Sequence, residues 1–162
     1  MPAVKHDAVR LVKLLTEKRL RLAVAESCTG GLVGSLIAGV PGASGIFWGG
    51  FTTYTVDAKQ KMLGIDAALL ERYGAVSMEC ASAMAASARE CADADLALSV
   101  TGLAGPLGDG SLNAVGTVWI GGSCLGLPPF AHGYHFTGSR NEIREKAAAS
   151  AIRLGIELVE LT

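Results

Sequence analysis

The sequence has little of what marks membrane, secreted or nucleic-acid-binding proteins. No apolar run is long enough to span a bilayer, because glycines and charges interrupt every candidate. The first residues lack the apolar segment of a signal peptide. The 14 lysines and arginines are balanced by 15 aspartates and glutamates, so no basic excess is available to neutralise a row of phosphates. We therefore expect a cytoplasmic protein that binds neither membranes nor nucleic acids.

Patterns typical of metal sites and disulfide frameworks are also missing. The four cysteines form no C-x-x-C pair, and no cysteine–histidine spacing matches a zinc site. We expect reduced, partly buried thiols at Cys28, Cys80, Cys91 and Cys124. The sequence predicts no metal and no cofactor.

Half of the 162 residues are hydrophobic, which is enough for one core in a single domain over residues 1–162. Apolar periodicity, caps and glycine or proline stops predict alternating helices and strands. The predicted helices are Val4–Leu15, Leu32–Ala38, Asp57–Leu63, a short one from the cap Asp66 to Tyr73, a long one from the cap Ser77 through Ala88, and Asn141–Leu161. The predicted strands are Arg21–Ala25, Ile46–Val56, Leu96–Val100, Val115–Gly121 and Pro129–Thr137. This order indicates an α/β protein, a three-layer α/β/α domain with a mixed, mostly parallel sheet.

A serine stands where a buried strand meets a glycine-rich turn, in the string AESCTGG at residues 25–31. Ligands of open α/β sheets collect at the carboxyl ends of strands, where free N–H groups can stabilise a phosphate, a carboxylate or an oxyanion. The alternative is that Ser27 or Thr29 only caps the next helix. The string is not a G-x-S-x-G elbow, because Ala25 occupies the first glycine position.

A serine nucleophile needs a base. The histidines lie away from the glycine-rich segments and are interpreted as ordinary surface or strand residues: His6, His132 and His135. A buried lysine can replace histidine when its pKa is lowered. Lys59, which follows Tyr54 at a strand-to-helix junction, is a candidate. A solvated helix lysine is the alternative, and Lys61 stays open as the base.

Two further segments could contact a ligand. The string TGLAGP at residues 101–106 follows a buried strand, and its glycines would let a ligand approach the backbone. A tight turn would explain those glycines equally well. Arg140, just before the last helix, could hold a phosphate through two parallel hydrogen bonds. Arg144, one turn later, is interpreted as a surface cation.

Taken together, these segments resemble the CinA C-terminal domain family, the nicotinamide-nucleotide amidases. Seven strings match in order and spacing and extend over nearly the whole chain. They are AESCTGG at 25–31, VPGAS at 40–44, Tyr54 with Ala58-Lys59 and Leu63-Gly64, GAVS at 74–77, VTGLAGP at 100–106, VGTVWI at 115–120, and GSR at 138–140 with Ile143-Arg144.

The resemblance implies a metal-free enzyme that deamidates a pyridine mononucleotide, converting nicotinamide mononucleotide to nicotinate mononucleotide and ammonia. It implies Ser27 as the nucleophile, Lys59 as the base, and Tyr54 as the residue that orients the lysine or relays its proton. It also implies that backbone N–H groups near Cys28, Thr29, Gly30 and Gly31 stabilise the oxyanion. The phosphate or ribose of the substrate would lie near Thr101, Gly102, Gly105 and Arg140.

Three positions depart from the family pattern. Val56 stands where asparagine is common, Asn113-Ala114 where a Lys-Pro pair is usual, and Ser139 where an acidic residue is usual. These departures favour an alternative function, a catalytically weak or inactive nucleotide-binding module of the same fold. The intact serine, tyrosine and lysine favour the enzyme. We expect a stand-alone form, and the sequence leaves the oligomeric state open, a homo-oligomer included.

Overall fold

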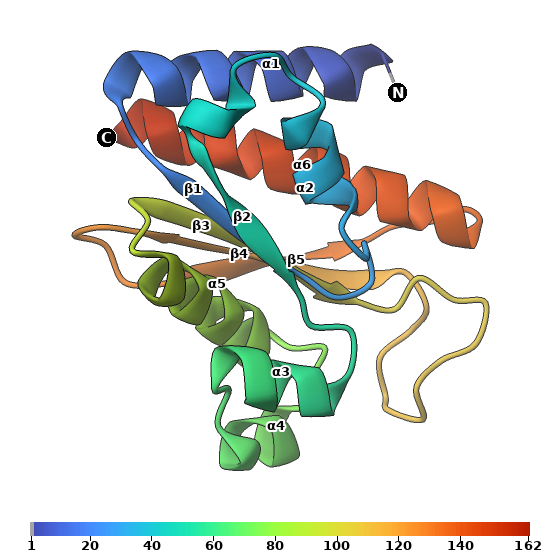
Figure 1. The fold of residues 1–162 in the computed structure, drawn as a ribbon. Helices are drawn as coiled ribbons and strands as arrows, with labels where there is room; N and C mark the ends of the chain where they lie inside the picture. The colour runs from blue at the N-terminus through green and yellow to red at the C-terminus, as the bar shows by residue number, and fades with distance from the viewer. Residues whose placement is uncertain (1) are drawn as a thin grey trace.

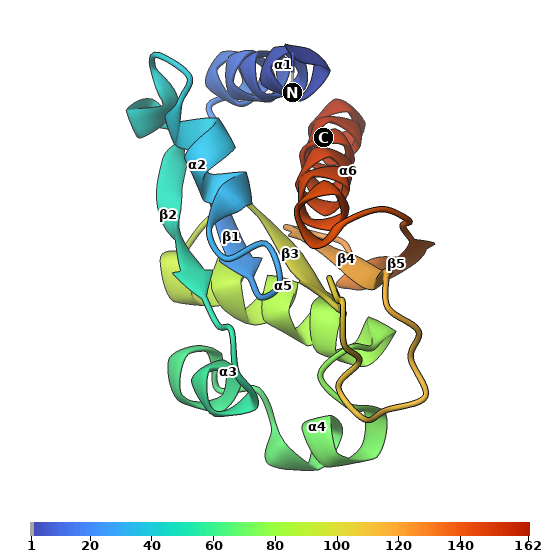
Figure 2. The same ribbon diagram turned by 90° about the vertical axis from the view of Figure 1, so that its right-hand side faces the viewer.

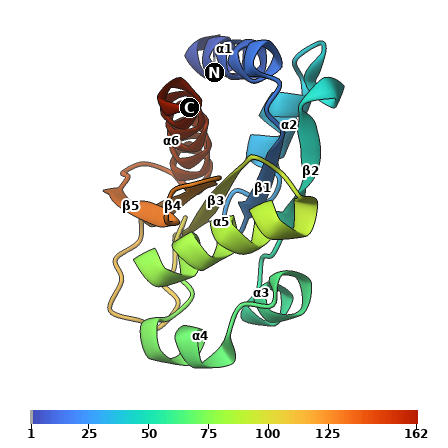
Figure 3. The same ribbon diagram turned by 90° about the vertical axis from the view of Figure 1, so that its left-hand side faces the viewer.

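The computed structural model describes residues 2–162, which form a five-stranded sheet with helices on both faces (Figure 1). The helices are α1 (Pro2–Lys18), α2 (Leu32–Ala38), α3 (Val56–Leu63), α4 (Ala67–Tyr73), α5 (Met78–Ala92) and α6 (Arg140–Leu161), with a 3-10 turn η1 (Ala43–Gly45). The strands are β1 (Leu22–Glu26), β2 (Phe47–Thr52), β3 (Leu96–Gly102), β4 (Thr117–Cys124) and β5 (Phe130–His135). Helices α1, α2 and α6 cover one face; α5, with α3 and α4 beyond it, covers the other (Figure 2 and Figure 3).

The strand order in the sheet is β2-β1-β3-β4-β5. β1 pairs in parallel with β2 and β3, whereas β4 runs antiparallel to both of its neighbours. In the described chain, β4 is therefore the strand that points against the others. The prediction of a three-layer domain with a mixed, mostly parallel sheet is confirmed. Because β1, β2 and β3 are parallel, their carboxyl ends meet at one edge of the sheet.

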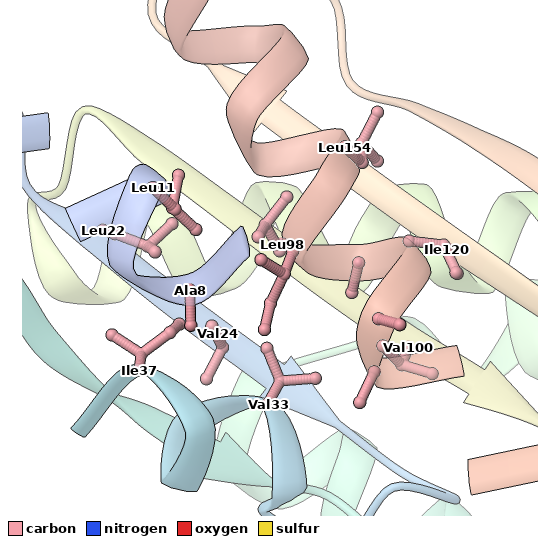
Figure 4. Close-up of a cluster of buried hydrophobic side chains, with 14 of the residues drawn as sticks. Ala8, Leu11, Leu22, Val24, Val33, Ile37, Leu98, Val100, Ile120 and Leu154 are labelled. Atoms are coloured by element: carbon pink, nitrogen blue, oxygen red, sulfur yellow. The ribbon is translucent and has the colours of Figure 1, made fainter. Parts of the chain in front are cut away.

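The main core lies between the sheet and the layer of α1, α2 and α6. Figure 4 shows Leu11 of α1, Val33 of α2 and Leu154 of α6 gathered with Leu98 of β3 and Ile120 of β4. A second, smaller apolar cluster packs α5 against the opposite face. Burying one such side chain contributes roughly 1.5–3 kcal/mol. The packing therefore fixes α2 and α6 relative to the carboxyl edge that they border.

One predicted strand was too long. The structure ends β2 at Thr52, whereas the prediction continued it to Val56, which is the first residue of α3. The reason is a cap: Thr55 has extended backbone, and its Oγ1 accepts the N–H of Ala58 at 3.0 Å. A threonine cap favours the start of a helix, here in spite of the β-branched residues around it.

Other boundaries moved by a few residues: β3 and α5 are longer than predicted, β4 is shifted toward the C-terminus, and β5 is shorter. β3 continues through Thr101 and Gly102, which pair with Trp119 and Val118 of β4. The strands predicted over Val115–Gly121 and Pro129–Thr137 are β4 and β5, with the bounds given above. The predicted long helix is α5, which continues four residues past Ala88 to Ala92.

The longest helix, α6, has 22 residues and buries mainly alanines and branched aliphatic residues. Charged residues occupy its other face, as in an amphipathic helix of a globular domain. Within residues 2–162, no helix combines the length and apolarity needed to cross a membrane.

Candidate active site

A hollow of about 190 Å³, hereafter "the hollow", opens at the carboxyl edge of the sheet. It is lined by Ser27, Cys28, Tyr54, Gly102, Leu103, Ala104, Gly105, Leu107 and Arg140. The connections that supply these residues follow β1, β2 and β3 and precede α6, and they lie at the same end of the sheet (Figure 2). The hollow is small, and its charged lining residue is the cation Arg140.

Ser27 forms one wall of the hollow, directly after β1. Its backbone N–H donates to the carbonyl of Val100 in β3 at 2.9 Å, which continues the β1–β3 pairing by one residue. The residue is 7% exposed. Ser27 is therefore held firmly by the sheet but remains reachable from the hollow.

Lys59 of α3 brings its amine to this serine. Its Nζ lies 3.0 Å from Ser27 Oγ and donates to the carbonyl of Thr53 at 2.9 Å, and the residue is 1% exposed. Lys61 is exposed and pairs with Asp57 at 3.1 Å, an ordinary ion pair between successive helix turns. Of the two lysines left open by the sequence, the structure brings Lys59 to Ser27.

The surroundings of Lys59 favour its neutral form. Burial lowers the pKa of the amine below its usual value, and the nearby thiols of Cys80 and Cys28 oppose that shift. Among residues 2–162, no carboxylate forms an ion pair with Lys59. A neutral amine has a free lone pair, so Lys59 can accept a proton from Ser27.

Two main-chain carbonyls accept hydrogen bonds from the serine–lysine pair, those of Tyr54 and Thr53. Ser27 Oγ lies 3.3 Å from the carbonyl oxygen of Tyr54, which accepts the hydroxyl hydrogen while Lys59 is charged. Once the amine is neutral, that hydrogen can turn to Nζ, and a remaining N–H of the amine can stay on the carbonyl of Thr53. The arrangement therefore allows proton transfer without movement of heavy atoms.

The side chain of Tyr54 does not join the serine–lysine pair. It is 53% exposed, and its hydroxyl accepts a hydrogen bond from Arg140 Nη2 at 2.8 Å. Within residues 2–162, no hydrogen bond links this hydroxyl to Lys59 or Ser27. In the structure, the carbonyls of Thr53 and Tyr54 contact the serine–lysine pair, whereas the tyrosine hydroxyl, from which the orienting contact was expected, contacts Arg140.

Cys28 follows the serine but is a poor nucleophile. Burial raises the pKa of its thiol to about 11, although the positive charges of Lys59 and Arg144 lower it. The reactive form of cysteine is the thiolate, which this environment disfavours at neutral pH. The geometry therefore favours Ser27 over Cys28 as the attacking group.

Glu26 is a site residue that the sequence reasoning missed. Its carboxylate is 1% exposed and accepts the N–H groups of Gly31, Val33 and Gly34 at 3.1, 3.0 and 2.8 Å. These donors open α2, so a carboxylate of the protein itself occupies that helix start. An acidic residue directly before a glycine-rich turn was the available signal.

This arrangement narrows the set of oxyanion donors. The N–H groups of Gly30 and Gly31 donate to protein acceptors inside the turn. In the part of the chain that the structure describes, Cys28 and Thr29 keep N–H groups without a protein acceptor. The expected donor set of residues 28–31 is thereby reduced to its first two members.

Arg140 reaches the hollow from the start of α6. Its guanidinium donates to the carbonyl of Gly105 and to the hydroxyl of Tyr54. Arginine has five N–H donors in a planar fork. Donors therefore remain for an anionic group placed in the hollow.

Some predicted binding residues lie behind the lining. Thr101 is 1% exposed and donates its hydroxyl to the carbonyl of Ala75 at 2.7 Å, and Thr29 is fully buried. Neither they nor the two turn glycines, Gly30 and Gly31, line the hollow. Gly102 does line it, but packing alone requires a glycine there, since a Cβ would lie 2.7 Å from the carbonyl oxygen of Thr117.

The three departures from the family pattern also lie outside the lining. Val56 opens α3, and Asn113 donates from Nδ2 to the carbonyl of Val76 at 3.2 Å. Ser139 is the N-cap of α6 and forms a capping box with Glu142. Asn113 and Ser139 thus form hydrogen bonds that support neighbouring loops, whereas the side chain of Val56 is exposed. None of the departing residues lines the hollow.

The three histidines lie away from the hollow. His132 and His135 are exposed on β5, and His6 is exposed on α1. Within residues 2–162, no group of three or more histidine, cysteine, aspartate or glutamate residues could hold a metal ion.

Arg144 is not the free surface cation that its sequence position suggested. It is half-buried, and its Nε and Nη2 donate to the carbonyls of Cys28 and Thr29 at 3.0 and 2.9 Å. It contacts the turn after Ser27 without lining the hollow.

Fold and site together define an α/β domain with a buried serine–lysine pair at the carboxyl edge of its sheet. The model of the CinA C-terminal domain matches residues 5–159. The chain belongs to the CinA C-terminal domain family.

Curated relatives agree with this assignment. A CinA-like protein from Geobacter metallireducens is 44% identical over 146 residues, and one from Thermotoga maritima is 42% identical over 142 residues. Each match covers 88% of this chain and 34% of the relative. The chain thus spans about a third of the length of these curated relatives.

Solved structures match over almost the whole length. A competence-damaged protein (CinA) superfamily protein from Klebsiella pneumoniae has a TM-score of 0.94 at 27% identity, covering 98% of this chain and 99% of that one. The competence/damage inducible protein CihA from Agrobacterium tumefaciens has a TM-score of 0.92 at 35% identity, covering 96% and 94%.

Proposed function

We propose that this chain is an amidohydrolase that converts nicotinamide mononucleotide to nicotinate mononucleotide and ammonia through a serine acyl-enzyme. The observation that carries the proposal is the 3.0 Å contact between the buried Nζ of Lys59 and Ser27 Oγ at the wall of the hollow. A hydroxyl with an adjacent unprotonated base is the minimum needed for acyl transfer. The substrate is inferred from the family resemblance, and it suits a small hollow whose charged lining residue is Arg140.

In the first half of the reaction, neutral Lys59 accepts the proton of Ser27 as Oγ attacks the carboxamide carbon. The carbonyl oxygen becomes an oxyanion. The N–H of Cys28, which lines the hollow, and the N–H of Thr29, the next residue of the turn, are the donors left to receive it. The Lys59 ammonium then gives its proton to the amide nitrogen. The carbon–nitrogen bond breaks, ammonia leaves, and an ester to Ser27 remains.

In the second half, water takes the place of ammonia. Lys59, neutral again, accepts a proton from the water as its oxygen attacks the ester carbon. The second oxyanion uses the same donors, and its collapse breaks the bond to Ser27 Oγ. Lys59 returns the proton to Oγ, which restores the starting state and releases nicotinate mononucleotide.

The direct test is ammonia release by purified protein from nicotinamide mononucleotide, with a chelator present and with Ser27→Ala beside the wild type. We expect ammonia and nicotinate mononucleotide in equal amounts from the wild type and neither from the variant. Binding of the mononucleotide without ammonia release would instead support a nucleotide-binding module. Neither binding nor release would reject this substrate.

A further inference from the structure

The turn that carries the nucleophile is held by a side chain from the far end of the sequence. Arg144 of α6 donates from Nε to the carbonyl of Cys28 at 3.0 Å and from Nη2 to the carbonyl of Thr29 at 2.9 Å. Its Nη1 donates to Oδ1 of Asn141 at 3.0 Å, which ties the guanidinium to its own helix. Three of its nitrogen atoms are thus engaged, and two of them hold successive peptide groups.

These two contacts fix the direction of the turn's N–H groups. A trans peptide is planar, so its carbonyl and its N–H point to opposite sides. Because the carbonyl of Cys28 accepts a hydrogen bond from Arg144, the N–H of Thr29 points away from Arg144. The carbonyl of Thr29 also accepts from Arg144, so the N–H of Gly30 points away as well. That N–H donates to the carbonyl of Ser27 at 3.0 Å.

The sequence of the turn is permissive, so contacts from outside it, those of Arg144 among them, restrict its conformation. Gly30 and Gly31 have φ angles of +59° and +102°, and glycine explores this region freely in the unfolded chain. Arginine suits the task because its planar fork can donate to two neighbouring carbonyls at once, whereas a lysine ammonium is a point donor on a flexible stem.

We propose that Arg144 is a positioning residue: it holds the peptides of Cys28 and Thr29 so that Ser27 Oγ and the free N–H groups of the turn are arranged for acyl transfer. This inference rests on the proposed function. Arg144 does not line the hollow, unlike Arg140 one turn earlier, so it acts through the turn and not by binding substrate.

The test compares Arg144→Met and Arg144→Lys with Arg153→Met. Arg153 lies on the same helix and pairs with Asp7 at 3.2 Å, away from the turn, so it controls for loss of one arginine from α6. With nicotinamide mononucleotide, Arg144→Met should lower kcat about 10- to 100-fold, as expected for a misplaced nucleophile and oxyanion site, with KM changed less than about 2-fold. Arg144→Lys should recover part of kcat, and the pH at which rate rises should be unchanged, because Lys59 keeps its surroundings.

A second readout does not depend on the substrate. A fluorophosphonate labels an activated serine: Oγ bonds to phosphorus, fluoride leaves, and the serine proton goes to the base. Labelling of Ser27, followed by intact-protein mass spectrometry, should be slower in Arg144→Met than in Arg153→Met. This result is expected even if the wild type releases no ammonia, an outcome that would reject the proposed substrate but not the role of Arg144. Equal labelling rates, or a raised KM with unchanged kcat, would overturn the role of Arg144. If Arg144→Met does not fold, the same comparison with Arg144→Lys decides.

Discussion

The two sides of the hollow are built differently. On one side, Ser27 and Lys59 are almost fully buried, and hydrogen bonds to main-chain groups fix the turn between β1 and α2. On the other side, Tyr54 is 53% exposed and Leu107 is 84% exposed. The loop between β3 and β4 supplies mostly glycine, alanine and leucine.

Under the proposed function, the buried side holds the reacting groups and the open side is the surface that recognises the substrate. Fixed, desolvated groups accelerate a reaction because their geometry and pKa are set before substrate arrives. An exposed wall with one cation would bind the proposed substrate about equally in the ground state and the transition state, and so would contribute little to the rate of the chemical step. Changes on the buried side should therefore act on kcat or stability, and changes on the open side on KM.

The largest effect should come from Ser27→Ala, which removes the nucleophile. We expect turnover to fall about 10,000-fold or more. Cys28→Ala should keep most of it, because burial raises the pKa of the thiol and so disfavours the thiolate. Both variants should fold, since each change is small; circular dichroism checks this beside the ammonia assay. An active Ser27→Ala enzyme together with a silent Cys28→Ala enzyme would assign the nucleophile to the cysteine.

The next effect should come from Lys59→Arg. Guanidinium does not lose its proton, so the base is removed while the charge is kept, and turnover should fall about 1,000-fold. In the wild type, the lowered pKa of Lys59 means that rate rises with pH as the amine deprotonates, with an inflection below the free-lysine value of about 10.4.

Lys61→Arg is the matched control, because Lys61 is exposed and two residues away. It should give the wild-type rate and the wild-type pH profile. A Lys59→Arg enzyme that keeps the same inflection would show that another group titrates.

A smaller effect, mainly on stability, should follow from Glu26→Gln. The amide has one acceptor oxygen, and its NH₂ would face backbone donors now bound by the carboxylate. We expect a loss of about 2–3 kcal/mol in the free energy of unfolding in urea, with a fall in kcat as the turn loosens. Glu17→Gln, on the exposed face of α1, should change stability by less than about 0.5 kcal/mol. Equal stability of the two variants would mean that the Glu26 contacts contribute nothing.

The sequence predicted the elements that local signals determine but not the contacts that depend on packing. Apolar runs and caps such as Ser77 and Thr55 act locally, so the layers and most elements were predictable, although the cap at Thr55 was overlooked and β2 was drawn too long. The proximity of Lys59 to Ser27 depends on how β2 and α3 pack against β1, which the residues alone left open and which only the resemblance suggested.

Roles decided by side-chain direction could not be predicted. Tyr54 contributes its carbonyl to Ser27 and its hydroxyl to Arg140, a division that depends on the backbone path into α3. Arg144 was interpreted as a surface cation because its acceptors, carbonyls more than 100 residues earlier, carry no sequence signature. Main-chain acceptors are present in every residue and so are not visible to pattern reasoning.

The smallest effect should come from the open side, with Arg140→Ala. Two of its donors already serve Tyr54 and Gly105, so the remaining N–H groups should hold the substrate phosphate. Loss of that contact should raise KM for nicotinamide mononucleotide about 10-fold, equivalent to about 1.4 kcal/mol, with kcat within about 2-fold. Nicotinamide riboside, which lacks the phosphate, should show little change in KM. Tyr54→Phe is the control, because it removes the hydroxyl that Arg140 binds but leaves the cation in place. Two results would contradict phosphate binding by Arg140: the same rise in KM with Tyr54→Phe, or an equal rise in KM for both substrates with Arg140→Ala. Arg140 would then support the wall of the hollow without binding phosphate. The open side would have to recognise its ligand by shape alone.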